Sequence, residues 1–166
     1  MEQGAFAPKV VNGARLRALF RRHVAGVAVV TSLNMIGRPL GVTVSTFTPV
    51  SLDPPLVGFW LAQGATWAEL REAPGFAVNV LGAGEAEAAA RFAGRGDRFA
   101  GVDWRTGPYG WPHLPGALTW LDCVPQSTHE AGDHVLLVGR VLSASAGPSS
   151  EPLIHHAGAL RALEAR

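Results

Sequence analysis

Hydroxyl side chains gather in the segment 41–51, GVTVSTFTPVS, where they occupy positions 43, 45, 46, 48 and 51. Threonine is common in β-strands, so strand propensity explains this composition by itself. The alternative is chemical, because small hydroxyls and free backbone groups can form hydrogen bonds with the rim of a flat polar ligand. Composition alone favours the first explanation and leaves the second open.

A second candidate is Thr66, which stands three residues before Glu69. This spacing is that of a capping box, and it predicts a short helix over 66–72 that closes before Pro74. A threonine at a helix N-terminus can serve a bound phosphate as well as its own cap, and Arg91 can supply the matching charge. Thr66 and Arg91 are therefore candidates for a phosphate site.

Other site patterns are incomplete. Gly82-Ala83-Gly84 follows an expected strand, but Glu87 stands where a dinucleotide fingerprint needs its third glycine, so we interpret the segment as a connecting turn. The sequence contains no G-x-S-x-G, which argues against a serine hydrolase. Cys123 lies in an apolar stretch and is interpreted as a packing residue, and the histidines lack metal-binding spacing, so we assign no metal.

Composition limits the partners and the setting. With 14 basic and 13 acidic residues, the net charge of +1 gives no field to attract nucleic acid or an acidic membrane. Hydrophobic residues make up 48% and charged residues 16% of the chain, so we expect some apolar surface to be used against another subunit. A single cysteine, no leader sequence and no apolar run of membrane-spanning length favour the cytoplasm. We expect one domain over 1–166, with a loosely ordered segment at 1–14.

Hydrophobic periodicity predicts many strands and few helices. Strands are expected over 24–33, 41–51, 56–61, 76–81, 117–124 and 134–145, with a weaker strand near 158–163. Short helices are expected over 66–72, over 85–92 and over 16–23, the last docked on the body, and a long ordered loop over 94–115. The pattern predicts a β-dominated α+β fold, an antiparallel barrel with short peripheral helices.

Four stretches resemble the flavin reductase family, the small partners of two-component flavin monooxygenases: FRRHVAGVAVVTS from Phe20, GVTVSTFTPVSLDPPLV from Gly41, GFAVNVL from Gly75 and GDHVLLVGRV from Gly132. Their order and spacing also match, along with DRFAGVDW from Asp97, so the resemblance covers roughly residues 15–163. It implies an FMN-binding split barrel built as a homodimer. It also implies FMN or FAD near the subunit interface, with NADH or NADPH delivering hydride to the flavin.

The resemblance also implies site residues. In such proteins the extended segment and the strand after the Pro-Pro pair line the flavin, which here points to Thr43, Val44, Ser45, Thr46, Trp60, Leu61 and Ala62. Thr66, Arg91 and Phe92 fall where the family handles the phosphate end. His134 matches the family's histidine near the nicotinamide, although without the resemblance a strand-end histidine with satisfied hydrogen bonds is the favoured interpretation. Hydride transfer between two cofactors needs orientation and electrostatics from the protein rather than a catalytic acid or base.

Some positions depart from the family's pattern. Trp60 is bulky for a residue beside the flavin, and it can stack on a ring or narrow the site. Met35 and Ile36 place apolar side chains at an expected hairpin tip, where they can reach a partner or the other subunit. We interpret Asn79 as the holder of a buried hydrogen bond and Arg98 as a charge that orders a loop rather than a phosphate ligand.

The sequence thus predicts an NAD(P)H:flavin oxidoreductase that passes reduced FMN or FAD by diffusion to a separate monooxygenase. One alternative is a split-barrel flavoprotein that holds FMN tightly and acts on another substrate. The other is a flavin- or heme-binding module without turnover.

Overall fold

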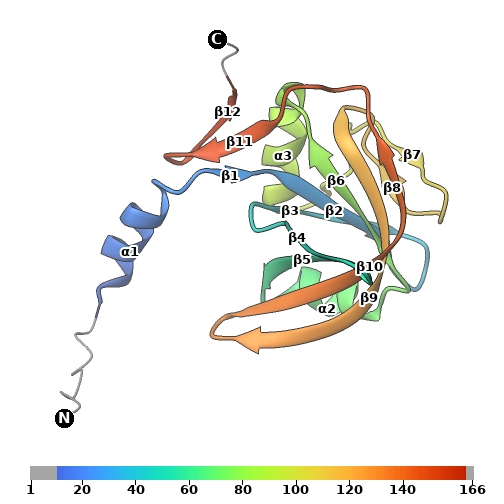
Figure 1. The fold of residues 1–166 in the computed structure, drawn as a ribbon, viewed down its shortest axis with the longest axis horizontal. Helices are drawn as coiled ribbons and strands as arrows, with labels where there is room; N and C mark the ends of the chain where they lie inside the picture. Colours follow the sequence, from blue (N-terminus) through green and yellow to red (C-terminus); the bar gives the residue numbers. More distant parts are fainter. Residues whose placement is uncertain (1–10, 164–166) are drawn as a thin grey trace.

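The computed structural model describes residues 11–163, and one antiparallel sheet of seven strands dominates it. The strand order is β3-β2-β6-β9-β10-β5-β4, and every described pairing is antiparallel. The sheet curves until the end of β3 meets β5, as Figure 1 shows. The bounds are β2 (Ala28–Leu33), β3 (Pro39–Val44), β4 (Thr48–Leu52), β5 (Pro55–Ala62), β6 (Phe76–Leu81), β9 (Ala117–Ala131) and β10 (His134–Ala146). The predicted β-dominated fold with short helices is confirmed.

Smaller elements surround this sheet. A three-stranded sheet consists of β1 (Ala25–Gly26), β11 (Leu153–His156) and β12 (Ala159–Ala162), and a two-stranded one of β7 (Arg105–Thr106) and β8 (Pro112–His113). The helices are α1 (Gly13–Phe20), α2 (Ala65–Glu72) and α3 (Ala86–Ala93), with a 3-10 turn at Ala83–Glu85. No helix within residues 11–163 is long and apolar enough to cross a membrane.

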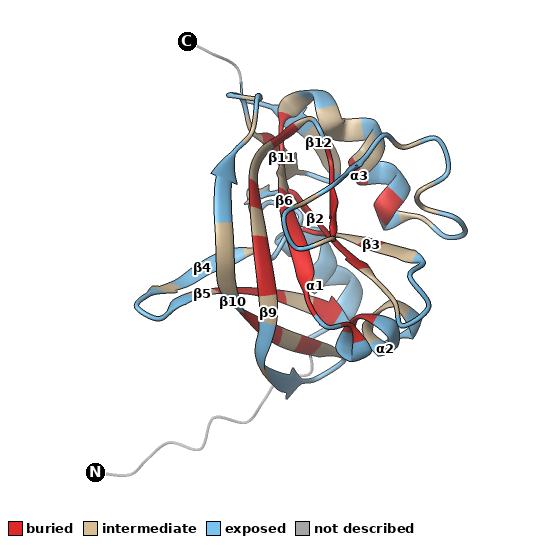
Figure 2. Cartoon of the chain, turned by 90° about the vertical axis from the view of Figure 1, so that its right-hand side faces the viewer, coloured by how far each residue is buried: buried red, intermediate tan, exposed pale blue. Residues whose placement is uncertain are grey.

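The core lies on both faces of the central strands. One cluster, which includes Phe59, Phe76 and Leu137, fills the inside of the curved sheet. The other, which includes Phe92, Leu114 and Leu153, lies between the sheet and α3. Figure 2 shows the buried positions along β2, β5, β6 and β9, whereas the exposed ends of β4 and β5 project from the body. The sheet is therefore buried at its centre and exposed at its rim (Figure 2).

Two predicted strands are each divided. The expected strand over 24–33 changes partners at Val27, whose N–H donates to Leu153 while its carbonyl accepts from Leu81. Residues before Val27 therefore pair with β11, and residues after it pair with β3 and β6. The expected strand over 41–51 breaks at 45–47, because β3 pairs with β2 whereas β4 pairs with β5. The break at 45–47 later proves to be part of the candidate site.

Other expectations also need correction. The expected loop over 94–115 contains β7 and β8. Strand β9 runs to Ala131, well beyond 124, because its polar end pairs with β10 across a turn at Gly132, where φ is +62°. The expected weak strand near 158–163 is β12, and it pairs with β11, for which we had no expectation.

Helix α1 does not dock on the body, so that prediction was wrong. None of its residues is buried, and Leu19 and Phe20 are 50% and 69% exposed. Figure 1 shows α1 standing apart from the sheet. Its first turn is capped by Asn12, whose Oδ1 accepts from the N–H of Ala14 at 2.8 Å, and its amphipathic pattern has no partner within residues 11–163.

The expected capping box of α2 is also wrong. Gly64 precedes the helix at the cap position, and no side chain caps the N-terminus. The Thr66 hydroxyl instead accepts a hydrogen bond from Arg98 at 3.1 Å. The Thr66 hydroxyl therefore bonds the guanidinium of Arg98, which is distant in the sequence, and does not cap its own helix as the spacing predicted.

Candidate functional site

A cleft of about 270 Å³ opens where β3, β5 and the start of β10 meet. It brings together every residue expected along the flavin ring and the histidine expected beside the nicotinamide. The lining residues are Val42, Thr43, Val44, Ser45, Thr46, Trp60, Leu61, Ala62 and His134.

Sheet closure builds this cleft. In the ladder of β10 with β5, His134 lies opposite Ala62, which places the imidazole beside the last residue of β5. On the other side, the Thr46 hydroxyl accepts from the N–H of Trp60 at 2.9 Å and donates to its carbonyl at 3.2 Å. These two hydrogen bonds hold the segment 45–47 against β5 at the mouth of the cleft.

The hydroxyls of the segment 41–51 do not share one role. Thr43 donates to the carbonyl of Ala89 in α3 at 2.7 Å, and Thr46 is used by Trp60. The Ser45 hydroxyl is exposed and has no hydrogen-bond partner within the described chain. Residues 45–47 also lie between the ladders of β3 and β4. Among the hydroxyls that line the cleft, the capacity left for a ligand is therefore that of Ser45, together with this short stretch of backbone.

His134 is half-exposed and oriented by its neighbour. Its Nδ1 lies 2.6 Å from Oδ1 of Asp133, and this hydrogen bond from His134 lowers the pKa of the Asp133 carboxyl below its ordinary value. An ionised carboxylate only accepts, so Nδ1 carries the proton. The other ring nitrogen, Nε2, is thus available to a ligand in the cleft.

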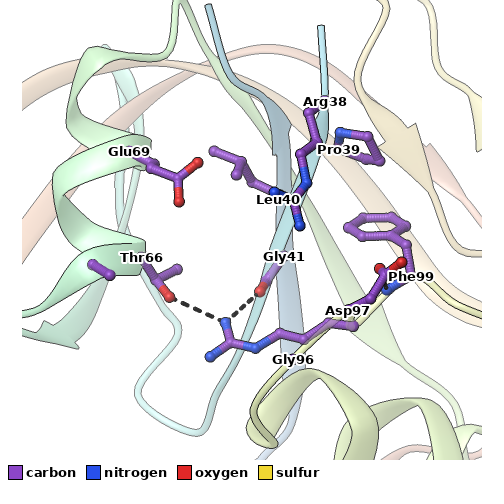
Figure 3. Close-up of a pocket in the computed structure, with 11 residues that line it drawn as sticks. Arg38, Pro39, Leu40, Gly41, Thr66, Glu69, Gly96, Asp97 and Phe99 are labelled. Carbon is purple, nitrogen blue, oxygen red and sulfur yellow. Dashed lines mark hydrogen bonds between the residues drawn. The ribbon is translucent and has the colours of Figure 1, made fainter. Parts of the chain in front are cut away.

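Thr66 lies in a separate cleft of about 170 Å³, bounded by β3, α2 and the loop 96–99. Figure 3 shows a guanidinium bonded to Thr66 and to the carbonyl of Gly41. It belongs to Arg98, which also donates to the carbonyl of Gly94 at 2.9 Å. Arg98 therefore orders its loop, as we interpreted it, but it also places a positive charge directly on Thr66. The stretch DRFAGVDW was the only sequence signal for this neighbourhood.

Arg91 and Phe92 do not line the cleft that contains Thr66, so their place at the phosphate end stays a prediction. Arg91 donates to the carbonyl of Ala100 at 2.8 Å and lies 3.7 Å from Glu87, one helical turn earlier, on a different pocket of about 290 Å³. Phe92 is fully buried, with its ring edge-on to Phe99 at 4.9 Å between centroids. The period of α3 directs Arg91 away from β3 and Phe92 into the core.

Polar residues inside the sheet are structural. Asn79 donates to the Val29 carbonyl and to the Thr31 hydroxyl, both at 3.0 Å, and accepts from the N–H of Leu114 at 2.7 Å. This agrees with its interpretation as a buried hydrogen-bonding residue. The sequence did not indicate the pair of His113 and Asp122, whose Nε2 and Oδ1 lie 3.0 Å apart in the interior.

Cys123 is fully buried, and this burial, with the Asp122 charge adding to it, raises the pKa of the thiol to about 12. A thiol with this pKa is protonated and inert near neutral pH. Within residues 11–163 no three His, Cys, Asp or Glu side chains are grouped to hold a metal ion.

The curved antiparallel sheet and the cleft at its rim define a split-barrel protein. A comparison with family models matches residues 20–164 to the flavin reductase like domain. The chain is 36% identical over 163 residues to the reductase subunit HsaB of a flavin-dependent monooxygenase from Rhodococcus jostii (strain RHA1), with 97% of this chain and 83% of the relative covered. It therefore belongs to the flavin reductase family.

Two further proteins are similar to this chain over most of their own length. The FMN reductase (NADH) SmoA of Agrobacterium fabrum is 38% identical over 155 residues, covering 93% of this chain and 88% of the relative. The structure of NADH:FAD oxidoreductase SgcE6 from Streptomyces globisporus C-1027, in complex with NAD and FAD fragments, matches with a TM-score of 0.86 and 36% identity, covering 95% of this chain and 98% of that one. Two relatives from Rhizobium meliloti are longer, and the chain spans 43% and 60% of them.

Proposed function

We propose that the protein is a cytoplasmic NAD(P)H:flavin oxidoreductase that reduces FMN or FAD and releases it to a separate monooxygenase. The observation that carries this proposal is the cleft of β3, β5 and β10, where an unused hydroxyl, backbone outside the ladders and an oriented imidazole face one space. The relatives support it by what they are named for: an NADH-using FMN reductase and a monooxygenase reductase subunit.

The lining residues suit a flavin. Apolar side chains of Val42, Val44 and Leu61 can contact a flat ring, and Trp60 adds an aromatic surface. Ser45 and the backbone of 45–47 can bond the polar rim of the ring system. Among the described residues that line this cleft, His134 is the one with an imidazole or carboxyl group that can act as a general acid or base. These features fit a site that orients a cofactor rather than one that moves protons.

Bound flavin supplies the redox chemistry, because it accepts hydride from the reduced nicotinamide. The chain's own residues orient the reactants and exclude water. Ser45 would bond the ring's rim, Trp60 and Val44 would cover its face, and His134 would present Nε2 to the nicotinamide or to charge on the reduced ring. For the phosphate end we retain Thr66 and pair it with Arg98, the guanidinium that contacts it, in place of Arg91.

The proposal includes a homodimer. Leu19, Phe20 and Val24 expose apolar surface on and just after α1, and Val50 and Leu52 do so on the edge strand β4. A second copy of the chain would remove this surface from water. Light scattering during size-exclusion chromatography should give twice the chain mass of 17.4 kDa, and a monomer mass at micromolar concentration would refute the dimer.

The test of the activity follows NADH and NADPH oxidation with FMN or FAD added in turn. We expect rapid turnover that depends on added flavin. Flavin binding without oxidation of either donor would refute the proposal in favour of a non-catalytic module, and protein that purifies with retained flavin and needs none added would favour a tightly bound flavoprotein.

A further inference from the structure

A second hollow, of about 760 Å³, adjoins the cleft. It lies between α1 and the strands β1 and β11, and Ser45 and Thr46 line both spaces. We call it the α1 groove. Because the two spaces share these residues, one extended molecule can have a ring in the cleft and its remaining length in the α1 groove.

The α1 groove is basic. Its lining includes Arg17, Arg21, His23 and His155 and contains no carboxylate from residues 11–163. None of the ion pairs between described residues involves Arg17 or Arg21. Arg17 lies in the last turn of α1, and Arg21, its C-cap, follows four residues later and donates its N–H to the carbonyl of Arg17. The two side chains therefore lie on one side of the helix end, and like charges at this spacing repel each other. An anion bound between the two guanidinium groups would attract both of them and offset their mutual repulsion.

Contacts with the turn between β11 and β12 hold Arg21 beside the α1 groove. The N–H of Ala157 donates to the carbonyl of Arg21 at 2.8 Å, which joins the end of α1 to the turn between β11 and β12. Ala25 pairs with His155 in the β1–β11 ladder. The Arg21 guanidinium lies against Gly158, where an added Cβ would stand 3.6 Å from its Cζ. Arg21, which directly follows α1, is thus held beside the groove by the β11–β12 turn, whereas α1 itself stands apart from the sheet.

We propose that the α1 groove binds the diphosphate of a dinucleotide whose ring end occupies the cleft. A diphosphate carries oxygens and charge suited to the planar fork of arginine, and two guanidinium groups with two imidazoles match one diphosphate better than they match any uncharged part of a cofactor. The inference rests on the proposed function for the ring end only. Two dinucleotides carry this group, the nicotinamide donor and FAD, whereas FMN and reduced nicotinamide mononucleotide lack it.

The test uses the variant Arg17→Gln/Arg21→Gln, because glutamine preserves helix propensity and removes both charges. The matched control is Arg15→Gln/Arg22→Gln, which removes two charges from the same segment outside the groove lining. Steady-state KM values are measured for the full-length protein with four pairs: NADH or reduced nicotinamide mononucleotide as donor, and FMN or FAD as acceptor. We expect about a tenfold increase in one dinucleotide's KM, consistent with the loss of charge-assisted hydrogen bonds at an exposed site.

The pattern of KM changes across the four substrate pairs identifies which dinucleotide places its diphosphate in the α1 groove. A higher KM for NADH with an unchanged KM for the mononucleotide donor assigns the groove to the nicotinamide cofactor. A higher KM for FAD with an unchanged KM for FMN assigns it to the flavin. Unchanged values for all four pairs would overturn the proposal. An equal loss for all pairs would also overturn it, because that would show that the arginines support the fold or the assembly.

A binding measurement separates this proposal from the proposed activity. Calorimetric titration with ADP, the part that FAD and NADH share, should show about tenfold weaker binding to the Arg17→Gln/Arg21→Gln variant than to the wild type and the control. If the wild type oxidises no reduced nicotinamide with any flavin, the proposed activity fails, and the ADP titration alone decides. Equal ADP affinity in all three proteins would then overturn the diphosphate site.

Discussion

Polar side chains in the interior of the sheet differ from those at its rim in how much of their hydrogen-bonding capacity is used. In the interior, Asn79 uses its donor and its acceptor, His113 and Asp122 satisfy each other, and no buried side-chain polar atom of the described residues lacks a partner. At the rim, Ser45 has no partner within residues 11–163, and His134 is bonded only through Nδ1. The difference separates two kinds of polar residue. Interior ones hold the fold, and rim ones remain available to a ligand.

The largest expected effect comes from the interior. Asn79→Leu keeps roughly the same volume but leaves the buried N–H of Leu114 without its partner, and it removes the hydrogen bonds that Asn79 donates to the Val29 carbonyl and the Thr31 hydroxyl. We expect a loss of roughly 3–5 kcal/mol in the free energy of unfolding, because buried unsatisfied groups each cost about 1–3 kcal/mol. Urea unfolding followed by tryptophan fluorescence measures it.

The control for Asn79 is Thr119→Val, in the neighbouring strand opposite Val80, since Thr119 makes no side-chain hydrogen bond to a described residue. This change should cost less than about 1 kcal/mol. Activity per folded molecule should stay unchanged in both variants. If Asn79→Leu lowered stability no more than the control, the interior polar residues would not be structural.

The next effect comes from the rim. His134→Ala removes the imidazole from the cleft, and we expect kcat/KM for NADH to fall about tenfold, equivalent to about 1.4 kcal/mol, with the dissociation constant for flavin nearly unchanged. The control is His129→Ala, an exposed histidine of the adjacent strand β9 that does not line the cleft. NADH kinetics that remain those of the wild type would remove His134 from the site.

A smaller effect concerns the buried thiol. Because burial raises the pKa of Cys123 to about 12, the folded state keeps a proton that the unfolded state loses above about pH 8.5. The free energy of unfolding should therefore fall by about 1 kcal/mol more between pH 7.5 and 9.5 in the wild type than in Cys123→Ala. Iodoacetamide should leave the native thiol unmodified at pH 8.5 and label it in urea. Rapid labelling of folded protein would contradict the packing role.

The sequence predicted the central strands well because their β-branched runs are continuous and fully buried, as in FAVNVL over 76–81. It failed where partners change. Nothing local in 24–33 indicates that Val27 passes from one sheet to another, and the polar end of β9 is paired only because β10 returns beside it. Such features are set by long-range pairing, which periodicity does not report.

The candidate site was likewise predicted in part, and the features that depend on long-range contacts were missed. The family resemblance implied that residues from Thr43 to Thr46 and from Trp60 to Ala62 line one site, and the structure brings them to one cleft. The sequence did not show that Arg91 lines a different pocket from Thr66, because its side-chain direction depends on the rotation of α3. It also did not show the contact of Arg98 with Thr66, because residues 32 apart in the sequence form it. Which threonine hydroxyls are already used also depended on distant carbonyls, those of Ala89 and Trp60.

The most direct test of the account is a flavin titration of a variant with a blocked cleft. Ala62→Phe adds a large side chain at an exposed lining residue opposite His134, and Thr128→Phe adds the same side chain at an exposed position on β9 that does not line the cleft. Flavin fluorescence should show that Ala62→Phe binds FMN at least about tenfold more weakly than the wild type, a loss of about 1.4 kcal/mol, while Thr128→Phe binds normally. Equal FMN affinity in all three proteins would place the flavin elsewhere and contradict the central claim.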